Sequence, residues 1–123
     1  MVVAVVLLAA CTGAQRPEPL PATAPTLDVC TAAESAVGTR VRMAADFASL
    51  GYGPESDMFT ADSGGPPCND NGPGLVIGTL WSQQAKDPLL GIFAGTPIVV
   101  EGTITEVEEG RIVHLDNALV REP

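Results

Sequence analysis

Aromatic side chains are scarce in this chain, which has one tryptophan, one tyrosine and three phenylalanines among 123 residues. Its core must therefore be built from valine, isoleucine, leucine and methionine. Histidine occurs once, at His114, and none of the three cysteines belongs to a Cys-x-x-Cys pair. These absences exclude the common zinc-ligand patterns and any site that needs several histidines. We therefore predict neither a metal ion nor another cofactor.

Basic residues are also few, because six lysines and arginines face fifteen acidic residues and the net charge is −9 at pH 7. A surface with this balance repels the phosphate backbones of DNA and RNA. We therefore expect no nucleic-acid partner. The same charge keeps a small domain in solution, so solubility alone explains the acidic composition without a binding partner.

The apolar run at the start of the chain is too short to cross a bilayer, which takes about 20 residues. It ends in Leu8-Ala9-Ala10-Cys11, and a polar, proline-spaced segment follows at once. These four residues resemble the lipobox of a bacterial lipoprotein precursor. The resemblance implies cleavage before Cys11 and acylation of that cysteine, so the domain would be anchored to a bacterial membrane on its extracytoplasmic side. The alternative is a buried N-terminal strand.

Signal peptides of this class carry lysine or arginine before the apolar run, whereas Met1 here leads straight into Val2. We therefore expect the natural start to lie upstream. The lipobox divides the chain into a signal peptide (1–10), a lipidated tether (11–29) and a domain (30–123). Alternating prolines favour polyproline II in the tether, which at about 3.1 Å per residue could hold the domain about 50 Å from the membrane.

With Cys11 acylated, Cys30 and Cys68 remain, and an oxidising compartment lets two such thiols pair. We predict a disulfide between them. It would remove about 4 kcal/mol of unfolded-state entropy in the chain-entropy estimate.

Hydrophobic periodicity predicts a mostly β domain. A short helix is expected after the capping-box spacing of Thr31 and Glu34. Val41, Met43 and alternate residues beyond them share one face of the first strand. In order, we predict strands over 39–47, 58–61, 75–81, 97–107 and 111–120, a loop over 62–74 and a weak helix over 82–93.

This order resembles an OB-fold, the small five-stranded barrel with a helix or loop between its third and fourth strands. The segments Val99–Ile104 and Ile112–Leu115 carry the resemblance best. An antiparallel β-sandwich is the alternative fold.

The candidate binding surface consists of side chains that we expect on outer strand faces or strand ends: Arg40, Arg42, Trp81 and Tyr52. On such faces of OB domains, basic and aromatic groups hold ligands. Glu101 and the acidic residues after it are expected to form a wet, charged rim on the last hairpin.

The segment Ala61–Pro66 is close to the sequence around the nucleophile of trypsin-like serine proteases. His114 follows Ser63 instead of preceding it, so the triad of that family cannot be assembled in its order. We therefore predict no catalytic residues. The predicted function is that of a non-catalytic, lipid-anchored module of the cell envelope that binds another envelope protein. The alternatives are a small enzyme or enzyme inhibitor acting through the 62–74 loop, and a module that binds a small ligand or oligosaccharide.

Overall fold

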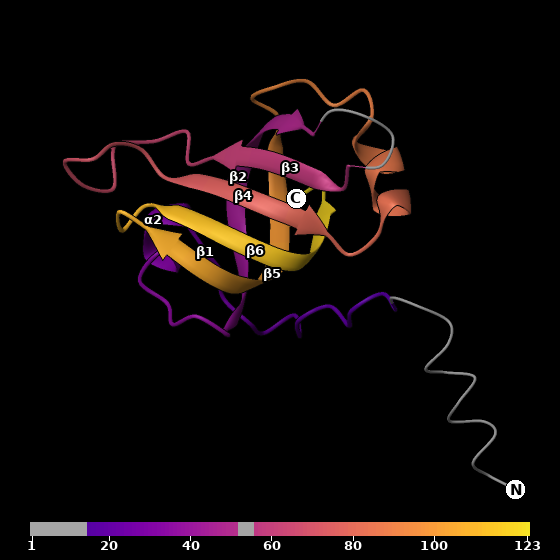
Figure 1. Cartoon of the computed structure of the whole chain (residues 1–123), viewed down its shortest axis with the longest axis horizontal. Coiled ribbons are helices and arrows are strands. Elements are labelled where there is room, and N and C mark those ends of the chain that lie inside the picture. Colours follow the sequence, from indigo (N-terminus) through magenta and orange to yellow (C-terminus); the bar gives the residue numbers. More distant parts are fainter. Residues whose placement is uncertain (1–14, 52–55) are drawn as a thin grey trace, which may run out of the picture.

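The structure is a computed structural model that describes residues 15–51 and 56–123 (Figure 1). Cys11 with its lipobox, and Tyr52, lie outside the described residues. The described elements are, in chain order, β1 (Thr26–Leu27), α2 (Val29–Ala32), β2 (Arg40–Leu50), β3 (Met58–Asp62), β4 (Leu75–Leu80), the 3-10 helix η1 (Gln83–Leu89), β5 (Pro97–Glu108) and β6 (Ile112–Arg121).

The strands form one sheet in the order β1-β2-β3-β4-β6-β5, and a further pairing of β2 with β5 closes it into a barrel. β4 and β6 are parallel, whereas β2–β3, β3–β4, β5–β6 and β2–β5 are antiparallel. This is the five-stranded OB-like barrel predicted from the sequence, with η1 between its third and fourth strands. The sandwich alternative is wrong, because a single sheet closes on itself.

The period-two pattern predicted for the first strand is confirmed. Val41, Met43 and Phe47 are all at least 94% buried inside the barrel. The interior also requires glycine at position 78, since a Cβ there would overlap the ring of buried Phe59 on the neighbouring strand. Aliphatic residues of every strand fill the remaining core.

A sixth strand was not predicted. Thr26 and Leu27 form β1, which pairs in parallel with Arg42 and Met43 of β2. β3 pairs with β2 only from Asp46 onward, so β1 covers the part of the β2 edge that β3 leaves free. Residues expected to belong to a free tether are therefore part of the sheet.

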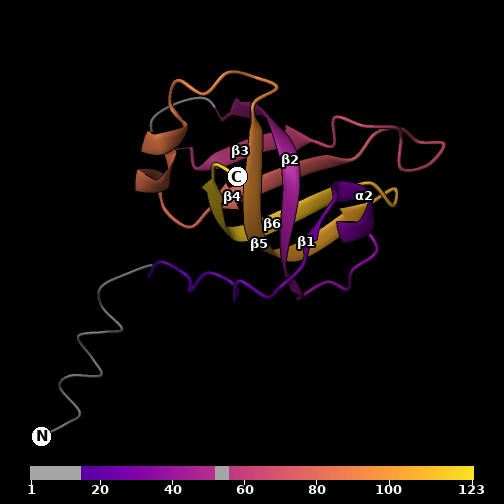
Figure 2. The same cartoon turned by 180° about the vertical axis from the view of Figure 1, so that it is seen from behind.

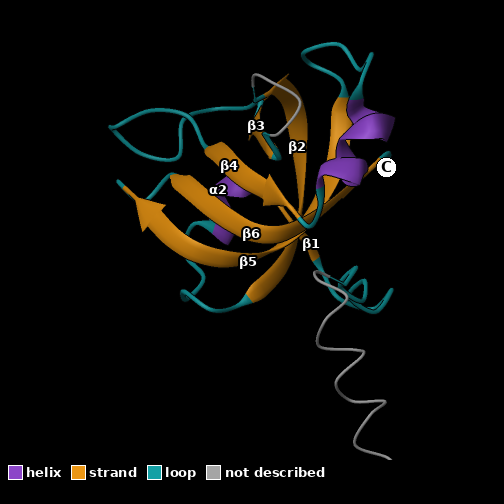
Figure 3. Cartoon of the chain, turned by 45° about the vertical axis from the view of Figure 1, so that its right-hand side comes forward, coloured by secondary structure: helices purple, strands orange, loops and turns teal. Residues whose placement is uncertain are grey.

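The predicted helix begins earlier and is shorter than expected. Its N-cap is Asp28, whose Oδ1 accepts a hydrogen bond from the Thr31 backbone N–H at 2.7 Å. The capping box predicted from Thr31 and Glu34 is therefore wrong, since Thr31 lies inside the helix. α2 and η1 lie at opposite ends of the barrel (Figures 1 and 3).

Candidate functional site

A cleft of about 290 Å³ opens beside η1, between the N-terminal segment and the barrel. Trp81, at the end of β4, forms part of its wall. The remaining lining comes from four other parts of the chain: Arg16 and Pro19 of the N-terminal segment, Gln84, Ala85 and Pro88 of η1, Val99 and Glu101 of β5, and Leu119, Val120 and Arg121 of β6.

The cleft exists because the N-terminal segment is fastened to the barrel. Arg42 is 7% exposed, and its Nε donates to Glu101 Oε2 at 3.1 Å. The other guanidinium nitrogens donate to backbone carbonyls of the segment, at 2.9 Å to Ala24 and at 2.8 and 3.1 Å to Leu20 and Pro21. The Leu20 backbone N–H in turn donates a hydrogen bond to Glu101 Oε1 at 2.6 Å. We call this arrangement the Arg42–Glu101 clamp.

The clamp corrects three expectations. Residues 16–27 do not form a free tether but lie along the outside of the barrel (Figures 1 and 2). Arg42 is not an exposed binding residue, because this segment covers it. Glu101 is 3% exposed and so does not belong to a wet rim. Its position directly opposite Arg42 in the β2–β5 register was the signal that sequence reasoning missed.

The clamp also decides the charge of the cleft. Glu101 is neutralised by Arg42, whereas Arg16 and Arg121 form no ion pair with a carboxylate among the described residues. The lining of the cleft therefore combines an apolar wall around Trp81 with two arginines, of which Arg121 donates from Nη1 to the Glu122 carbonyl at 3.2 Å. Neither Arg16 nor Arg121 was singled out from the sequence.

Among the described residues of the predicted surface, only Trp81 lies in this cleft. Arg40 lines a separate hollow and donates to Thr103 Oγ1 at 3.3 Å and to the Asn117 carbonyl at 3.0 Å. Arg42 lines that second hollow beside Arg40, so the structure separates these two arginines from Trp81. Tyr52 lies outside the described residues.

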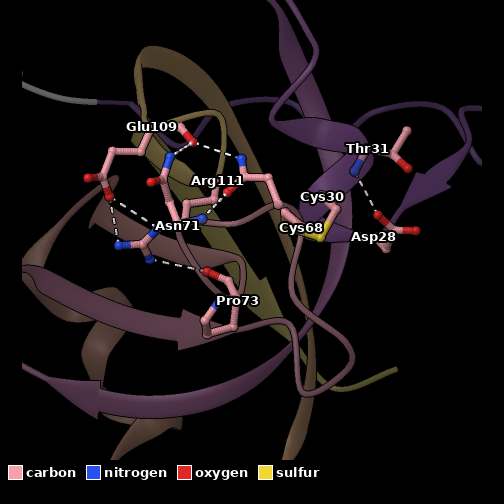
Figure 4. The surroundings of a disulfide bond; sticks show 9 residues. Asp28, Cys30, Thr31, Cys68, Asn71, Pro73, Glu109 and Arg111 are labelled. Atoms are coloured by element: carbon pink, nitrogen blue, oxygen red, sulfur yellow. Dashed lines mark hydrogen bonds and ion pairs between the residues drawn. A yellow bond between two sulfur atoms is a disulfide. The ribbon is translucent and has the colours of Figure 1, made fainter.

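The predicted disulfide between Cys30 and Cys68 is present (Figure 4). It ties α2 to the loop between β3 and β4. Position 74 of that loop must be glycine, since a Cβ there would lie 2.8 Å from Val29 Cγ1. Because such bonds form in oxidising compartments, the disulfide indicates an extracytoplasmic domain.

The hairpin between β5 and β6 braces the same loop (Figure 4). Arg111 Nη1 donates to the Pro73 carbonyl at 3.2 Å, and Arg111 Nη2 pairs with Glu109 Oε1 at 2.8 Å. Asn69 Nδ2 donates to the Glu109 carbonyl at 2.9 Å. The loop is thus held at the disulfide and at the hairpin.

The protease-like segment does not assemble a nucleophile. Asp62 Oδ1 accepts from the Gly64 N–H at 3.1 Å, as a turn-forming aspartate does. Ser63 Oγ is buried and has no hydrogen-bond partner among the residues that the structure describes. It lies in a hollow lined by Asp28, Cys30, Cys68, Gly65 and two prolines. His114 is not among the residues of this hollow, and its Nε2 contacts Glu108 Oε1 instead.

Glu106, Glu108 and His114 are the described residues that could hold a metal ion, because their ligand atoms lie within 4.8 Å of one another. Both glutamates are exposed. The contact between His114 and Glu108 is also what an ion pair on the surface of a hairpin produces. The arrangement therefore does not by itself identify a metal site.

No helix among the described residues has both the length and the apolar character needed to cross a membrane.

No protein-family profile matches the chain, and no curated protein is similar to it in sequence. Among solved structures, the barrel is similar to a chain named as an aspartyl-tRNA synthetase from Leishmania major Friedlin, with a TM-score of 0.56 and 10% identity. The match covers 94% of this chain and 25% of the other, so this chain corresponds to about a quarter of that protein. At this identity the likeness supports the fold alone.

Proposed function

We propose that this chain is a lipid-anchored binding module of a bacterial cell envelope, without a catalytic role, and that the Trp81 cleft is its ligand site. The observation that carries this proposal is the cleft itself, which joins an apolar wall to two arginines that form no ion pair with a described carboxylate. The disulfide supports the compartment. The lipobox supports the anchor.

The clamp brings the barrel closer to the membrane than a free tether would. Leu20 is fastened to the barrel and lies nine residues after Cys11. A fully extended chain of that length reaches about 30 Å. A barrel anchored through Cys11 would therefore work within about 30 Å of the bilayer, instead of the 50 Å expected from a free tether.

The cleft favours a small anion that carries an apolar group. Arginine recognises carboxylates with paired donors, and here two arginines, Arg16 and Arg121, line the hollow. Trp81, Val99 and Leu119 provide apolar surface beside them. The ligand class that fits is a short carboxylate with an aromatic or aliphatic end, including the carboxyl end of a peptide.

The anchor is tested by the mass of the protein recovered from bacterial membranes. We expect cleavage before Cys11 and the added mass of acyl chains on that residue. A Cys11→Ser variant should leave the membrane fraction. A Cys11→Ser variant that remains membrane-bound to the same extent contradicts the anchor.

The ligand site is tested by the fluorescence of Trp81, which is the chain's only tryptophan. Phenylacetate serves as the probe, and 2-phenylethanol as its neutral counterpart. We expect saturable quenching or enhancement by phenylacetate alone, weakened at least fivefold by Arg121→Gln and by Arg16→Gln. Arg111→Gln, on the distant hairpin, is the matched control and should bind like the parent. Equal responses to both probes contradict the site.

A second candidate function is binding of an envelope protein through residues 63–74. This loop extends beyond the barrel (Figure 1) and is held by the disulfide and by Arg111. A braced, protruding loop can dock on a protein partner, and it would act as an inhibitor if that partner were an enzyme. Crosslinking in intact cells from a reactive group at exposed Asp70 would capture such a partner, and a control group at exposed Ala44 should not capture the same protein.

Single-stranded nucleic acid is a weaker candidate, although one structural neighbour is named as a tRNA synthetase. The net charge of −9 opposes it, and the clamp removes Arg42 from the surface. We expect no change in the anisotropy of a labelled single-stranded RNA at physiological salt.

A further inference from the structure

The N-terminal segment (residues 16–27) is held to the barrel by a few hydrogen bonds and buries little apolar surface. No residue in it is fully buried, and the half-buried ones are Pro17, Leu20, Ala24 and Leu27. It is fastened by the Arg42–Glu101 clamp and by the two residues of β1. Buried apolar surface is the main favourable term in packing. A segment with so little of it can detach locally while the barrel stays folded.

Two hollows undercut the segment. The Trp81 cleft lies beside Arg16 and Pro19, and the second hollow, of about 240 Å³, is lined by segment residues from Leu20 to Leu27. Glu101 lines the first hollow and Arg42 lines the second. The ion pair of the clamp therefore lies between the two hollows, where it joins the segment to the barrel.

One wall of the Trp81 cleft depends on the clamp for its position. The bond of the clamp nearest the N-terminus joins the Leu20 N–H to Glu101 Oε1. Arg16 and Pro19 come just before Leu20, so this bond determines where they lie over the cleft. The other walls belong to the barrel and to η1. The cleft is therefore complete only while the segment is docked.

We infer that a ligand in the Trp81 cleft and the docked N-terminal segment stabilise each other, which makes Arg42, Glu101 and the Leu20 N–H positioning groups of the ligand site. This inference rests on the proposed ligand site and adds regulation to it. A ligand that contacts Arg16 on the segment and Trp81 on the barrel binds the docked state in preference to the detached one. Two events linked in this way are coupled by the same free energy in both directions.

The coupling would also control the reach of a lipid-anchored chain. Leu20 is nine residues after Cys11, whereas Asp28, the first residue after β1, is seventeen residues after it. Extended chains of these lengths reach about 30 Å and about 57 Å. A filled cleft would therefore keep the barrel on the shorter tether, near the bilayer.

The direct test is amide hydrogen exchange of the parent protein with and without phenylacetate, the probe of the ligand site. The Leu20 amide exchanges when the segment detaches, and a ligand at nine times its Kd reduces the detached population about tenfold. We therefore expect exchange at Leu20 to slow about tenfold. The Gly72 amide, which donates to the Asn69 carbonyl at 3.1 Å in the loop between β3 and β4, is the control and should exchange at an unchanged rate.

A variant tests the coupling from the other direction. Leu20→Pro removes the N–H that bonds Glu101 and changes none of the residues that line the cleft. Prolines already flank this position, so its backbone is restricted to extended conformations that proline also adopts. Trp81 fluorescence should show affinity for phenylacetate weakened at least fivefold.

Ala22→Pro is the matched control for this variant. Ala22 is exposed, and its N–H forms no hydrogen bond with a described residue. It occupies the second position of the turn that the Ala24 N–H closes on the Pro21 carbonyl, a position that favours proline. Circular dichroism checks that both variants fold, and Ala22→Pro should bind phenylacetate like the parent.

Unchanged exchange at Leu20 in the presence of bound phenylacetate would overturn the inference and leave the ligand site intact. A folded Leu20→Pro variant that binds as tightly as the parent would also overturn it. A parent protein that does not bind phenylacetate contradicts the proposed ligand site itself, and the inference fails with it. The fluorescence titration of the parent therefore distinguishes the two failures.

Discussion

Two arginine–glutamate pairs in this molecule have similar contacts and opposite surroundings. Arg42 and Arg111 each place Nε at 3.1 Å from a glutamate oxygen. In the Arg42–Glu101 pair the side chains are 7% and 4% exposed, whereas in the Arg111–Glu109 pair they are 20% and 50% exposed. The difference arises from a segment far away in the sequence, which covers one pair and not the other.

Burial changes what each pair does. Water and salt screen the hairpin pair, so its attraction contributes little to stability. The covered pair is shielded from water, so each of its charges must be compensated inside the protein. Glu101 is compensated by Arg42, and Arg42 by Glu101 and by the carbonyls of Leu20, Pro21 and Ala24. The comparison teaches that the clamp, and not the ion pair alone, makes the N-terminal segment part of the domain.

The largest effect is expected from Arg42→Ala. It leaves Glu101 buried without a counter-charge and removes the donors to three carbonyls, so unfolding should become easier by about 3–5 kcal/mol. Urea unfolding measures this. The double variant Arg42→Met with Glu101→Leu should recover most of the stability while its N-terminal segment becomes sensitive to protease. A single variant as stable as the parent contradicts the clamp.

Reduction of the disulfide ranks next. Replacing Cys30 and Cys68 by serine should lower the free energy of unfolding by about 2–4 kcal/mol, because the unfolded chain gains freedom. The same urea experiment applies. As a control, the parent protein treated with reductant should unfold at the same urea concentration as the variant. If the variant instead unfolds at the urea concentration of the untreated parent, the disulfide does not stabilise the fold.

A smaller effect is expected at the N-cap of α2. The hydrogen bond from the Thr31 backbone N–H, followed by that from the Thr31 hydroxyl, lowers the pKa of Asp28 below its ordinary value near 3.8. Because the folded pKa is the lower one, the contribution of Asp28 is complete above its ordinary pKa and disappears as the pH falls through its folded pKa.

Replacement of Asp28 by alanine should cost about 1 kcal/mol at neutral pH. Asp28→Asn keeps a capping side chain and should lose only the pH-dependent part. Chemical unfolding between pH 2 and 7 separates the two variants. If the parent and the asparagine variant show the same acid dependence, Asp28 does not carry it.

The smallest effect is expected at the hairpin. Arg111→Ala should change the free energy of unfolding by less than about 1 kcal/mol, because the pair with Glu109 is exposed. Its comparison with Arg42→Ala is the sharpest test of the difference between the two pairs. A loss as large as that of Arg42→Ala would show that the bond to Pro73 matters more than burial.

Strand order and the barrel could be predicted because they depend on local patterns, and the disulfide because two cysteines remain once Cys11 is assigned to the lipobox. Alternation along 39–47 and the turn residues between strands determine most of the sheet. The clamp could not be predicted in this way. The alternating prolines around Pro19 and Pro21 indicate an extended, solvated segment, and only tertiary contacts reveal that their neighbours' carbonyls bind Arg42.

The candidate site was predicted less completely than the fold. Trp81 was identified because it ends the predicted third strand, and aromatic residues on such faces of OB domains hold ligands. Arg16 and Arg121 were missed, since one lies in the expected tether and the other at the end of the last strand. Their proximity depends on the path of the clamped segment, and no spacing in the sequence encodes it.

Amide hydrogen exchange at Leu20 tests the central claim most directly, because its N–H donates to buried Glu101 at 2.6 Å. In NMR-detected exchange on the folded protein, we expect this amide to be protected at least a hundredfold over an unstructured peptide. The neighbouring exposed Glu18 amide serves as an internal reference and should exchange faster. Exchange of Leu20 at the unstructured rate would contradict the clamp and return residues 16–27 to a free tether.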